Sequence, residues 1–408
     1  MQSLNKTTDS LLASAKQSLL YTANRPDVVM TRGEGMYLWD TEGKSYLDYI
    51  GGWAVTSLGH SPAVLQEALA YQSSQLVHAS PGFFNRPMIE FADLLTEISG
   101  FDKVFFASSG AEANESAIKL ARKHGSLHLN GAYEIITMTN SFHGRTLATM
   151  SATGKPAFEP LFEPKVPGFK HVPINDFDAC FAAISDRTCA IMLELVQGEG
   201  GVHSVEAPYL QALRKACDVY NIMLIFDEVQ TGLGRTGKLF AYEHYGVKPD
   251  VMTLAKGIGS GFPLSAMLTT EQYDLFEPGD QGGTYSAAPI SMAAGHAVVS
   301  EILQQGLAEN AAKQGALIQE KLTALSEDYA VSQIRGKGLL LAFDIPEGTA
   351  PVLAAECMKE GLLVNAPNAR TIRLMPPLIV TAEEVEKMIQ IMTGVLEACG
   401  LHNEAVYS

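Results

Sequence analysis

The chain has 408 residues, 47% of them hydrophobic, which is enough for a large core and more than one domain. Its 45 acidic and 29 basic residues give a formal net charge of −16 without a basic patch, which argues against nucleic acid and anionic membranes as partners. Five cysteines without C-x-x-C spacing indicate neither a disulfide framework nor a metal site. The N-terminal stretch lacks a signal-peptide pattern and no segment is long and apolar enough to cross a bilayer, so we expect a cytoplasmic protein.

The first predicted elements are two strands in residues 35–55, "GMYLWDTEGKSYLDYIGGWAV", where near period-two alternation surrounds an Asp-Thr-Glu-Gly turn. From there to about residue 270, apolar strands alternate with helices, which is typical of a mostly parallel sheet covered on both faces. The expected strands are 103–108, 133–138, 189–195, 222–228, 250–256 and 264–270, and the clearest helices are 110–124 and 207–220.

The pattern changes after residue 288. Two long amphipathic helices are expected at roughly 289–326, and further helices at about 350–360 and from about 382, with strand-like segments at 331–346 and 362–377. We therefore predict an α/β fold in which 61–288 form a large domain. The N-terminal segment 1–60 and the C-terminal segment 289–408 would build a smaller α+β domain.

Unusual residues stand at three predicted strand ends, where open α/β sheets bind ligands. Asp227 ends one apolar strand and Lys256 ends the next, while Ser109, Gly110 and Ala111 open a helix after a third. A buried carboxylate needs a cation, a desolvated lysine becomes nucleophilic, and a helix start with glycine binds phosphate. Taken singly, the lysine could simply reach solvent and the serine could be an ordinary helix cap.

Together these three features match the needs of pyridoxal phosphate (PLP): a phosphate anchor, a lysine for a Schiff base and an acid that keeps the pyridine nitrogen protonated. Two nucleotide-binding alternatives fail. The glycines of "KGIGSG" lead into another apolar strand rather than a helix, and "TEGKS" has Leu38 where a Walker A motif needs its first glycine.

The segment "LIFDEVQTGLGRTGKLFAYEHYGVKPDVMTLAKGIGSG" resembles the signature of the class III, or ω-amino-acid, aminotransferases of PLP fold type I. The resemblance covers nearly the whole chain through "SSGAEANESAIKLAR", "SFHGRTLATMSATGKP", "ELVQGEGGV" and "DQGGTY". Within the family, the chain is most similar to the bacterial acetylornithine aminotransferases.

The resemblance implies a role for each matching position around PLP. Lys256 would form the Schiff base and carry the proton, and Asp227 would hold the pyridinium. The remaining cofactor contacts would come from Gln230 at the phenolic oxygen, Phe142 and Val229 on the two ring faces, His143 beside them, Ser109, Gly110 and Ala111 at the phosphate, and Thr284 from the partner subunit.

The same resemblance assigns the substrate contacts. Arg145 would bind the carboxylate remote from the reacting amine, and Arg373 would bind the α-carboxylate of glutamate or 2-oxoglutarate. Glu199 would pair with Arg373 and mask it when an ω-amine enters. Gly283 would lie near the substrate.

The expected activity is transfer of the ω-amino group of N-acetylornithine, or of a similar N-acylated diamine, to 2-oxoglutarate by a homodimer that needs no metal. The products would be the semialdehyde and glutamate, in bacterial arginine or related diamine metabolism. Alternative substrates are ornithine, 4-aminobutyrate, succinylornithine and succinyldiaminopimelate, since residues 286–289, "SAAP", depart from the usual family pattern near the substrate mouth. A PLP aminomutase, a decarboxylase and a catalytically silent relative are the other classes considered.

Overall fold

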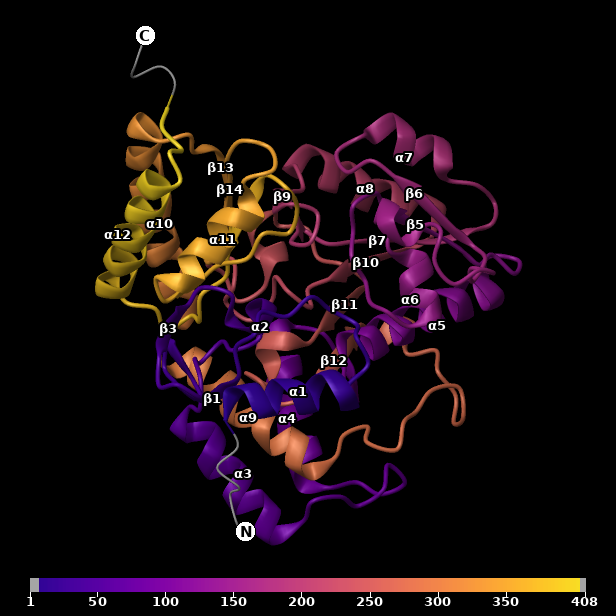
Figure 1. Cartoon of the computed structure of the whole chain (residues 1–408). Helices are drawn as coiled ribbons and strands as arrows, with labels where there is room; N and C mark the ends of the chain where they lie inside the picture. Colours follow the sequence, from indigo (N-terminus) through magenta and orange to yellow (C-terminus); the bar gives the residue numbers. More distant parts are fainter. Residues whose placement is uncertain (1–6, 404–408) are drawn as a thin grey trace.

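The structure is a computed structural model that describes residues 7–403 of the chain. Its main sheet has seven strands in the order β4-β12-β11-β10-β7-β5-β6 (Figure 1). Their bounds are β4 Lys103–Ala107, β5 Glu134–Met138, β6 Phe169–Val172, β7 Thr188–Leu193, β10 Met223–Asp227, β11 Val251–Leu254 and β12 Ser265–Thr269. Strand β12 is antiparallel to both of its neighbours, and every other pairing in this sheet is parallel. The predicted mostly parallel sheet is confirmed.

The two faces of this sheet are covered by different helices because successive strand residues point to opposite sides. In β10, Leu224 and Phe226 pack in one core with helix α8, whereas Met223 and Ile225 pack in another with helix α5. The helices of this part are α5 Gly110–His128, α6 Leu147–Ala152, α7 Phe177–Ala183 and α8 Ala207–Tyr220. The predicted helices at 110–124 and 207–220 are therefore present, and the sheet is buried on both sides.

A second layer of sheets joins the two ends of the chain. The N-terminal strands and β15 form a sheet in the order β1-β2-β3-β15, in which β15 pairs in parallel with β3. Strands β13, β14 and β16 form a separate antiparallel sheet. The bounds are β1 Met30–Glu34, β2 Tyr37–Asp40, β3 Ser45–Asp48, β13 Ser332–Lys337, β14 Leu340–Asp344, β15 Leu362–Leu363 and β16 Thr371–Leu374. The hairpin predicted in 35–55 is present as β2 and β3, while the domain boundaries near residues 60 and 288 stay predictions.

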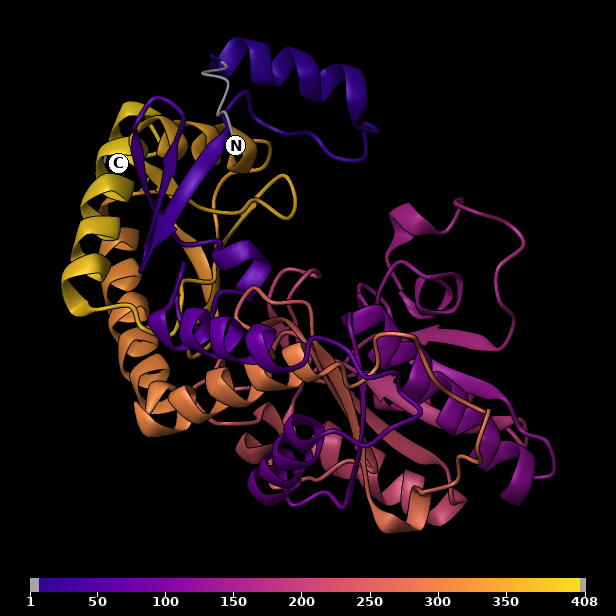
Figure 2. The same ribbon diagram turned by 90° about the horizontal axis from the view of Figure 1, so that it is seen from below.

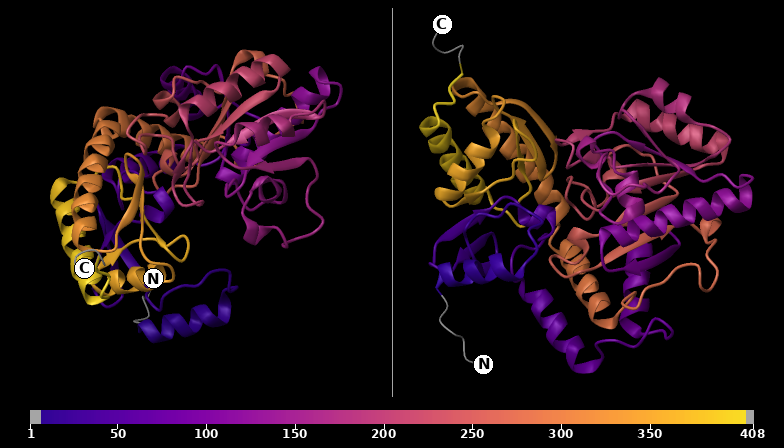
Figure 3. Two further views of the ribbon diagram at one scale, coloured as in Figure 1. Left: turned by 90° about the horizontal axis from the view of Figure 1, so that it is seen from above. Right: turned by 45° about the vertical axis from the view of Figure 1, so that its right-hand side comes forward.

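The C-terminal helices lie on the outer side of these smaller sheets, as the yellow and orange ribbons show in Figure 1. They are α10 Leu307–Asp328, α11 Ala350–Lys359 and α12 Ala382–Ala398. Helix α9 Pro289–Gln304 packs against α3 Ala63–Gln75 and α4 Arg86–Ser99, two helices that the sequence analysis did not predict. Helix α1 Thr8–Ser18 has no buried residue and stands away from the body in Figures 2 and 3.

The remaining regular elements are short. They are α2 Gly51–Ala54, β8 Val196–Gln197, β9 His203–Ser204, and the 3-10 turns η1 Pro156–Phe158, η2 Ala241–His244, η3 Lys256–Ile258 and η4 Glu271–Tyr273. Within residues 7–403, no helix combines the length and apolar character needed to cross a bilayer. The same residues contain no group of three or more His, Cys, Asp or Glu side chains arranged to hold a metal ion.

Candidate active site

A cavity of about 400 Å³ lies at the carboxyl ends of β4, β5, β7, β10 and β11. This is the position at which an open α/β sheet binds its ligand, because the loops after parallel strands meet there. The cavity is lined by ten of the predicted site residues: Ser109, Gly110, Ala111, Phe142, His143, Arg145, Asp227, Val229, Gln230 and Lys256. Val55, Ser108, Asn114 and Glu194 also line it, and the sequence analysis did not predict a role for them.

Asp227 is buried at the end of β10 and is held by three hydrogen bonds. Asn114 Nδ2 donates to its Oδ2 at 2.7 Å, the backbone N–H of Val229 donates to its Oδ1 at 3.0 Å, and His143 Nδ1 lies 2.8 Å from Oδ2. The Nε2 atom of His143 is buried and has no hydrogen-bond partner among the described residues. These three contacts orient the carboxylate, which lines the cavity and is suited to pair with a cationic group there.

The neighbouring acid, Glu228, serves a different purpose. Its two carboxylate oxygens accept hydrogen bonds from the backbone N–H groups of Ala241, at 2.7 Å, and Tyr242, at 2.9 Å, so it caps the turn η2. Burial raises the pKa of Glu228 to about 7, against the effect of these hydrogen bonds. Of the two acids that end the apolar segment 222–226, only Asp227 lines the cavity.

Helix α5 starts at the cavity wall. Ser109 is its N-cap, and the backbone N–H groups of Gly110 and Ala111 donate no hydrogen bond to any described residue. Gly110 lies so close to the β10 loop that a Cβ there would be 2.8 Å from Cγ1 of Val229. Free N–H groups at the start of a 19-residue helix form an anion site, and the glycine allows the close approach.

Lys256 follows β11 and opens the turn η3. Its φ of 45° lies in the left-handed region, which is unusual for a residue with a side chain. No hydrogen bond of its Nζ to another described residue is present, and the side chain lines the cavity. Burial lowers the pKa of Lys256, although the charges of Glu199 and Asp227 oppose this effect. An amine that is unpaired and easily deprotonated is suited to act as a nucleophile.

Glu194 is a buried acid of the same cavity that the sequence analysis missed. It follows the last residue of β7, and its Oε2 is buried without a hydrogen-bond partner among the described residues. Burial, together with the negative charge of Asp227, raises the pKa of Glu194 well above its usual value. The side chain is therefore a candidate neutral carboxylic acid beside Lys256.

Arg373 and Glu199 form an ion pair of 2.7 Å, as their resemblance to the family predicts. Arg373, on β16, is 1% exposed and also donates to the carbonyl of Gly198 at 2.6 Å and to Asn365 Oδ1 at 3.0 Å. Glu199 is more exposed and receives a second cation, since Lys155 Nζ lies 3.1 Å from its Oε2. Burial alone would raise the pKa of Glu199, but the charges of Arg373 and Lys155 outweigh it and lower the pKa to about 2.

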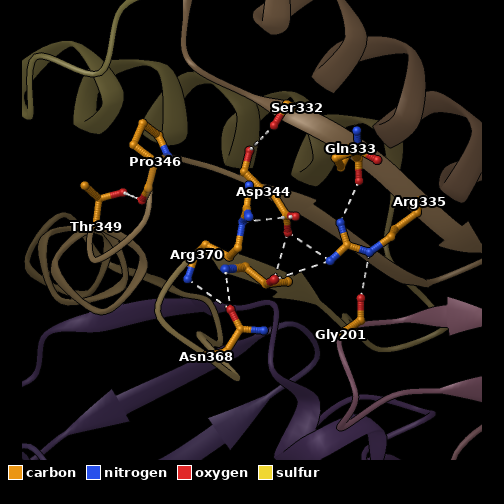
Figure 4. Close-up of polar contacts among 10 residues, drawn as sticks. Gly201, Ser332, Gln333, Arg335, Asp344, Pro346, Thr349, Asn368 and Arg370 are labelled. Atoms are coloured by element: carbon orange, nitrogen blue, oxygen red, sulfur yellow. Dashed lines mark hydrogen bonds and ion pairs between the residues drawn. The ribbon is translucent and has the colours of Figure 1, made fainter. Parts of the chain in front are cut away.

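The loop that carries Glu199 is joined to the sheet that carries Arg373 by a second arginine (Figure 4). Arg335, on β13, donates to the carbonyl of Gly201 at 2.7 Å and forms an ion pair of 2.9 Å with Asp344 on β14. Asp344 in turn accepts a hydrogen bond of 2.7 Å from Thr371, two residues before Arg373. These contacts fix the backbone of the 198–201 loop relative to β16.

Arg145 is the most exposed of the charged residues at the cavity. Its guanidinium carbon lies 5.0 Å from the ring centroid of Phe158 and 5.9 Å from that of Phe142. The two aromatic rings meet edge to face, with centroids 6.3 Å apart. These are cation–π contacts, and no ion pair or hydrogen bond of the Arg145 guanidinium to another described residue is present, so it is available to bind a carboxylate.

Four predicted site residues do not line this cavity in the single chain: Glu199 and Arg373, which form the ion pair described above, and Thr284 and Gly283, which lie on another loop. Thr284 and Gly283 are exposed, and the Thr284 carbonyl lies 2.7 Å from His78 Nε2. The predicted role of Thr284 involves a second subunit, that of Gly283 is contact with the substrate, and both stay predictions.

The donor set fits PLP. The free N–H groups of Gly110 and Ala111 suit its phosphate, the oriented Asp227 carboxylate suits its ring nitrogen, and the unpaired amine of Lys256 suits its aldehyde carbon. The fold and this site define a PLP-dependent enzyme of fold type I.

The chain belongs to the class III aminotransferases, since the family model for aminotransferase class III matches residues 21–396. It is 46% identical to the acetylornithine aminotransferase of Caldanaerobacter subterraneus subsp. tengcongensis, over 95% of this chain and 99% of that protein. It is 49% identical to acetylornithine aminotransferase 2 of Bordetella pertussis, over 93% of this chain and 97% of that protein. The chain is therefore a PLP-dependent transaminase, which acts on an amino donor and a keto acid.

Solved structures show the same relationship. The ornithine aminotransferase of Toxoplasma gondii matches with a TM-score of 0.92 and 29% identity, over 97% of this chain and 96% of that chain. A second structure of that enzyme contains PLP at partial occupancy in the active site. The acetylornithine aminotransferase of Elizabethkingia anophelis matches with a TM-score of 0.86 and 31% identity, over 96% of this chain and 100% of that chain.

Proposed function

We propose that this transaminase moves the ω-amino group of N-acetylornithine, or of a closely similar N-acylated diamine, to 2-oxoglutarate. The products are the corresponding semialdehyde and glutamate. The relatives named acetylornithine aminotransferase, at 46% and 49% identity over nearly the whole chain, support this substrate class. Free ornithine is the second candidate, because the T. gondii enzyme of similar structure is an ornithine aminotransferase.

The observation that carries the proposal is the ion pair of Glu199 and Arg373, at 2.7 Å. An ω-amine has no carboxylate next to the reacting carbon, so a free buried arginine would be left unpaired when that substrate binds. Glutamate has such a carboxylate and requires the same arginine. A glutamate side chain that masks Arg373 in one half-reaction and leaves it in the other lets one cavity accept both substrates.

The other residues have roles that follow from their positions. When bound, PLP supplies an electron sink for the electrons left behind when the reacting carbon loses its proton. Lys256 Nζ takes that proton and returns it, because a neutral amine is a competent general base. Asp227 would pair with the protonated ring nitrogen of PLP. Arg145 binds the substrate carboxylate that is remote from the amine.

We further propose a homodimer in the cytoplasm. Thr284 and Gly283 are exposed on a loop outside the cavity of their own subunit, so a second subunit would bring them to the opposite site. Exposed aromatic side chains lie near this loop in the fold: Phe83, Phe84 and Tyr285 are between 69% and 88% exposed, and Phe83 and Phe84 line one hollow together with Gln281, Gly282 and Ser286. Large apolar side chains at this exposure suit a protein interface.

The half-reactions test the substrate assignment. PLP-loaded protein is mixed separately with acetylornithine, free ornithine, 4-aminobutyrate and glutamate, without a keto acid, and the loss of the cofactor absorbance is followed. We expect fast conversion with acetylornithine and glutamate, and much slower conversion with free ornithine. Fast conversion with ornithine or 4-aminobutyrate and slow conversion with acetylornithine would overturn the assignment. Chromatography of the holoenzyme tests the dimer.

A further inference from the structure

Lys155 gives Glu199 a second cationic partner, which the masking of Arg373 by itself does not require. One carboxylate oxygen of Glu199 lies 2.7 Å from Arg373, and the other lies 3.1 Å from Lys155 Nζ. The side chains of Glu199 and Lys155 are each 24% exposed, whereas that of Arg373 is 1% exposed. The carboxylate therefore bridges an inner cation and an outer one.

The backbone that carries Glu199 is fixed on both sides of this residue. Arg373 binds the carbonyl of Gly198, Arg335 binds the carbonyl of Gly201, and the N–H of Val202 donates to the carbonyl of Gln197 at 2.9 Å (Figure 4 shows the Arg335 contact). The bond between Val202 and Gln197 closes the loop on itself, and a shift of the whole loop would break both arginine contacts. Release of Arg373 is therefore expected through rotation of the Glu199 side chain alone.

The backbone next to Lys155 is fixed as well. The N–H of Gly154 donates to Ser141 Oγ at 3.1 Å, and the N–H of Asn140 donates to the carbonyl of Gly154 at 2.8 Å. A Cβ at Gly154 would lie 2.2 Å from the carbonyl oxygen of Met138, so the chain runs directly against the end of β5. Because this backbone is held in place, Lys155 Nζ stays within reach of Glu199.

We propose that Lys155 is a positioning residue that retains Glu199 when the α-carboxylate of glutamate or 2-oxoglutarate takes over Arg373. A carboxylate that leaves Arg373 without another cation would be desolvated and unpaired, at a cost that opposes binding of the dicarboxylate substrate. The existing contact with Lys155 removes most of that cost, because one half of the bridge persists. This inference rests on the proposed function and deepens it by adding a residue that balances the two half-reactions.

The test compares the two half-reactions in Lys155→Gln, which keeps a polar side chain of nearly the same length but removes the charge. The quantity compared is the apparent second-order rate constant for glutamate divided by that for acetylornithine. We expect this ratio to fall roughly tenfold in Lys155→Gln, as for the loss of one partly buried charge-assisted contact. The Kd for glutarate, a dicarboxylate that cannot react, should rise by a similar factor. Lys155→Arg should restore both values, since it keeps a cation.

Two controls separate this role from a general loss of structure. In a Glu199→Gln background, Lys155→Gln should leave the ratio unchanged, because there is no carboxylate to retain. Lys170→Gln removes a matched lysine from an ion pair of 2.6 Å with Glu134 outside the cavity, and it should not change the ratio in any background. An unchanged ratio in Lys155→Gln, or an equal further loss in the Glu199→Gln background, would overturn the inference.

Failure of the proposed function has a different signature. In that case the wild-type protein itself would not convert acetylornithine or glutamate. If the wild-type protein converts both and only the Lys155→Gln ratio is unaffected, the proposed function stands and the role of Lys155 is wrong.

Discussion

Asn114 donates a hydrogen bond of 2.7 Å to Asp227, and both side chains are buried. The same amide nitrogen donates to the carbonyl of His143 at 2.8 Å, and the amide oxygen accepts from Thr253 Oγ1 at 2.7 Å. One side chain on α5 thus ties together the β10 acid, the loop after β5 and strand β11. Together with His143 and the backbone of Val229, Asn114 therefore orients the acid that serves the cofactor.

Asn114→Ala should therefore weaken PLP binding roughly tenfold and lower the free energy of unfolding by about 1 to 3 kcal/mol, because it leaves buried groups without their partner. Titration of the apo-protein with PLP and urea unfolding measure the two effects. Gln72→Ala removes another buried amide, in α3, and should affect stability without affecting PLP affinity. Unchanged PLP affinity in Asn114→Ala would mean that Asn114 has only a structural role.

The left-handed conformation of Lys256 gives a prediction that separates stability from activity. Its φ of 45° strains any residue with a Cβ, and glycine relieves the strain. Both Lys256→Gly and Lys256→Ala should lose transamination, but the glycine variant should be about 1 kcal/mol more stable to unfolding than the alanine variant. Lys321, inside α10, is the matched control, since glycine there should be about 1 kcal/mol less stable than alanine. If the glycine and alanine variants rank in the same order of stability at positions 256 and 321, the backbone strain inferred for Lys256 is wrong.

Gly110→Ala tests the close approach of α5 to the β10 loop. The added methyl group would lie 2.8 Å from Val229 Cγ1, so one of the two cavity walls has to move. We expect the affinity for PLP to fall by roughly tenfold or more, with a loss of about 1 to 3 kcal/mol in stability from overpacking. Gly394→Ala is the control, because a Cβ on this exposed glycine of α12 meets nothing within 4 Å and should stabilise the helix. PLP affinity that is equal in both variants would be evidence against the proposed anchor.

The sequence predicts the part of this site that depends on local pattern. The apolar segments 222–226 and 251–254 predict two adjacent buried strands, and Asp227 and Lys256 follow them within two residues. Parallel strands bring these ends together, so the two side chains share one cavity without further information. The resemblance to the family adds Arg373 and Glu199, which lie 174 positions apart in the chain yet form an ion pair.

The residues that were missed depend on packing between distant segments. Asn114 lies one turn inside a helix, where its sequence neighbours say nothing about Asp227, which is 113 positions away. Lys155, in "SATGKP", is typical of a surface lysine until the fold brings Glu199 to it. Helix α3 was missed because it has almost no amphipathic pattern and buries only two of its 13 residues, Leu65 and Gln72.

The ion pairs of Glu199 predict how stability depends on pH. Although burial opposes the charged form, Arg373 and Lys155 lower the pKa of Glu199 from 4.5 to about 2 in the folded protein. A lowered carboxyl pKa means that the unfolded chain binds the proton more readily than the folded chain does. The stabilisation is therefore fully present above about pH 4.5, and it is lost as the pH falls through about 2.

Glu199→Gln should accordingly be about 2 kcal/mol less stable than the wild-type protein at pH 6, allowing for partial solvent exposure, and this difference should shrink steadily below about pH 4.5. Urea unfolding of both proteins at pH 6, 4 and 3 measures it. Lys155→Gln removes one of the two cations, so Glu199→Gln in that background should show a smaller difference at pH 6 and a weaker dependence on pH. A difference that stays constant from pH 6 to 3 would mean that the charge of Glu199 does not stabilise the fold.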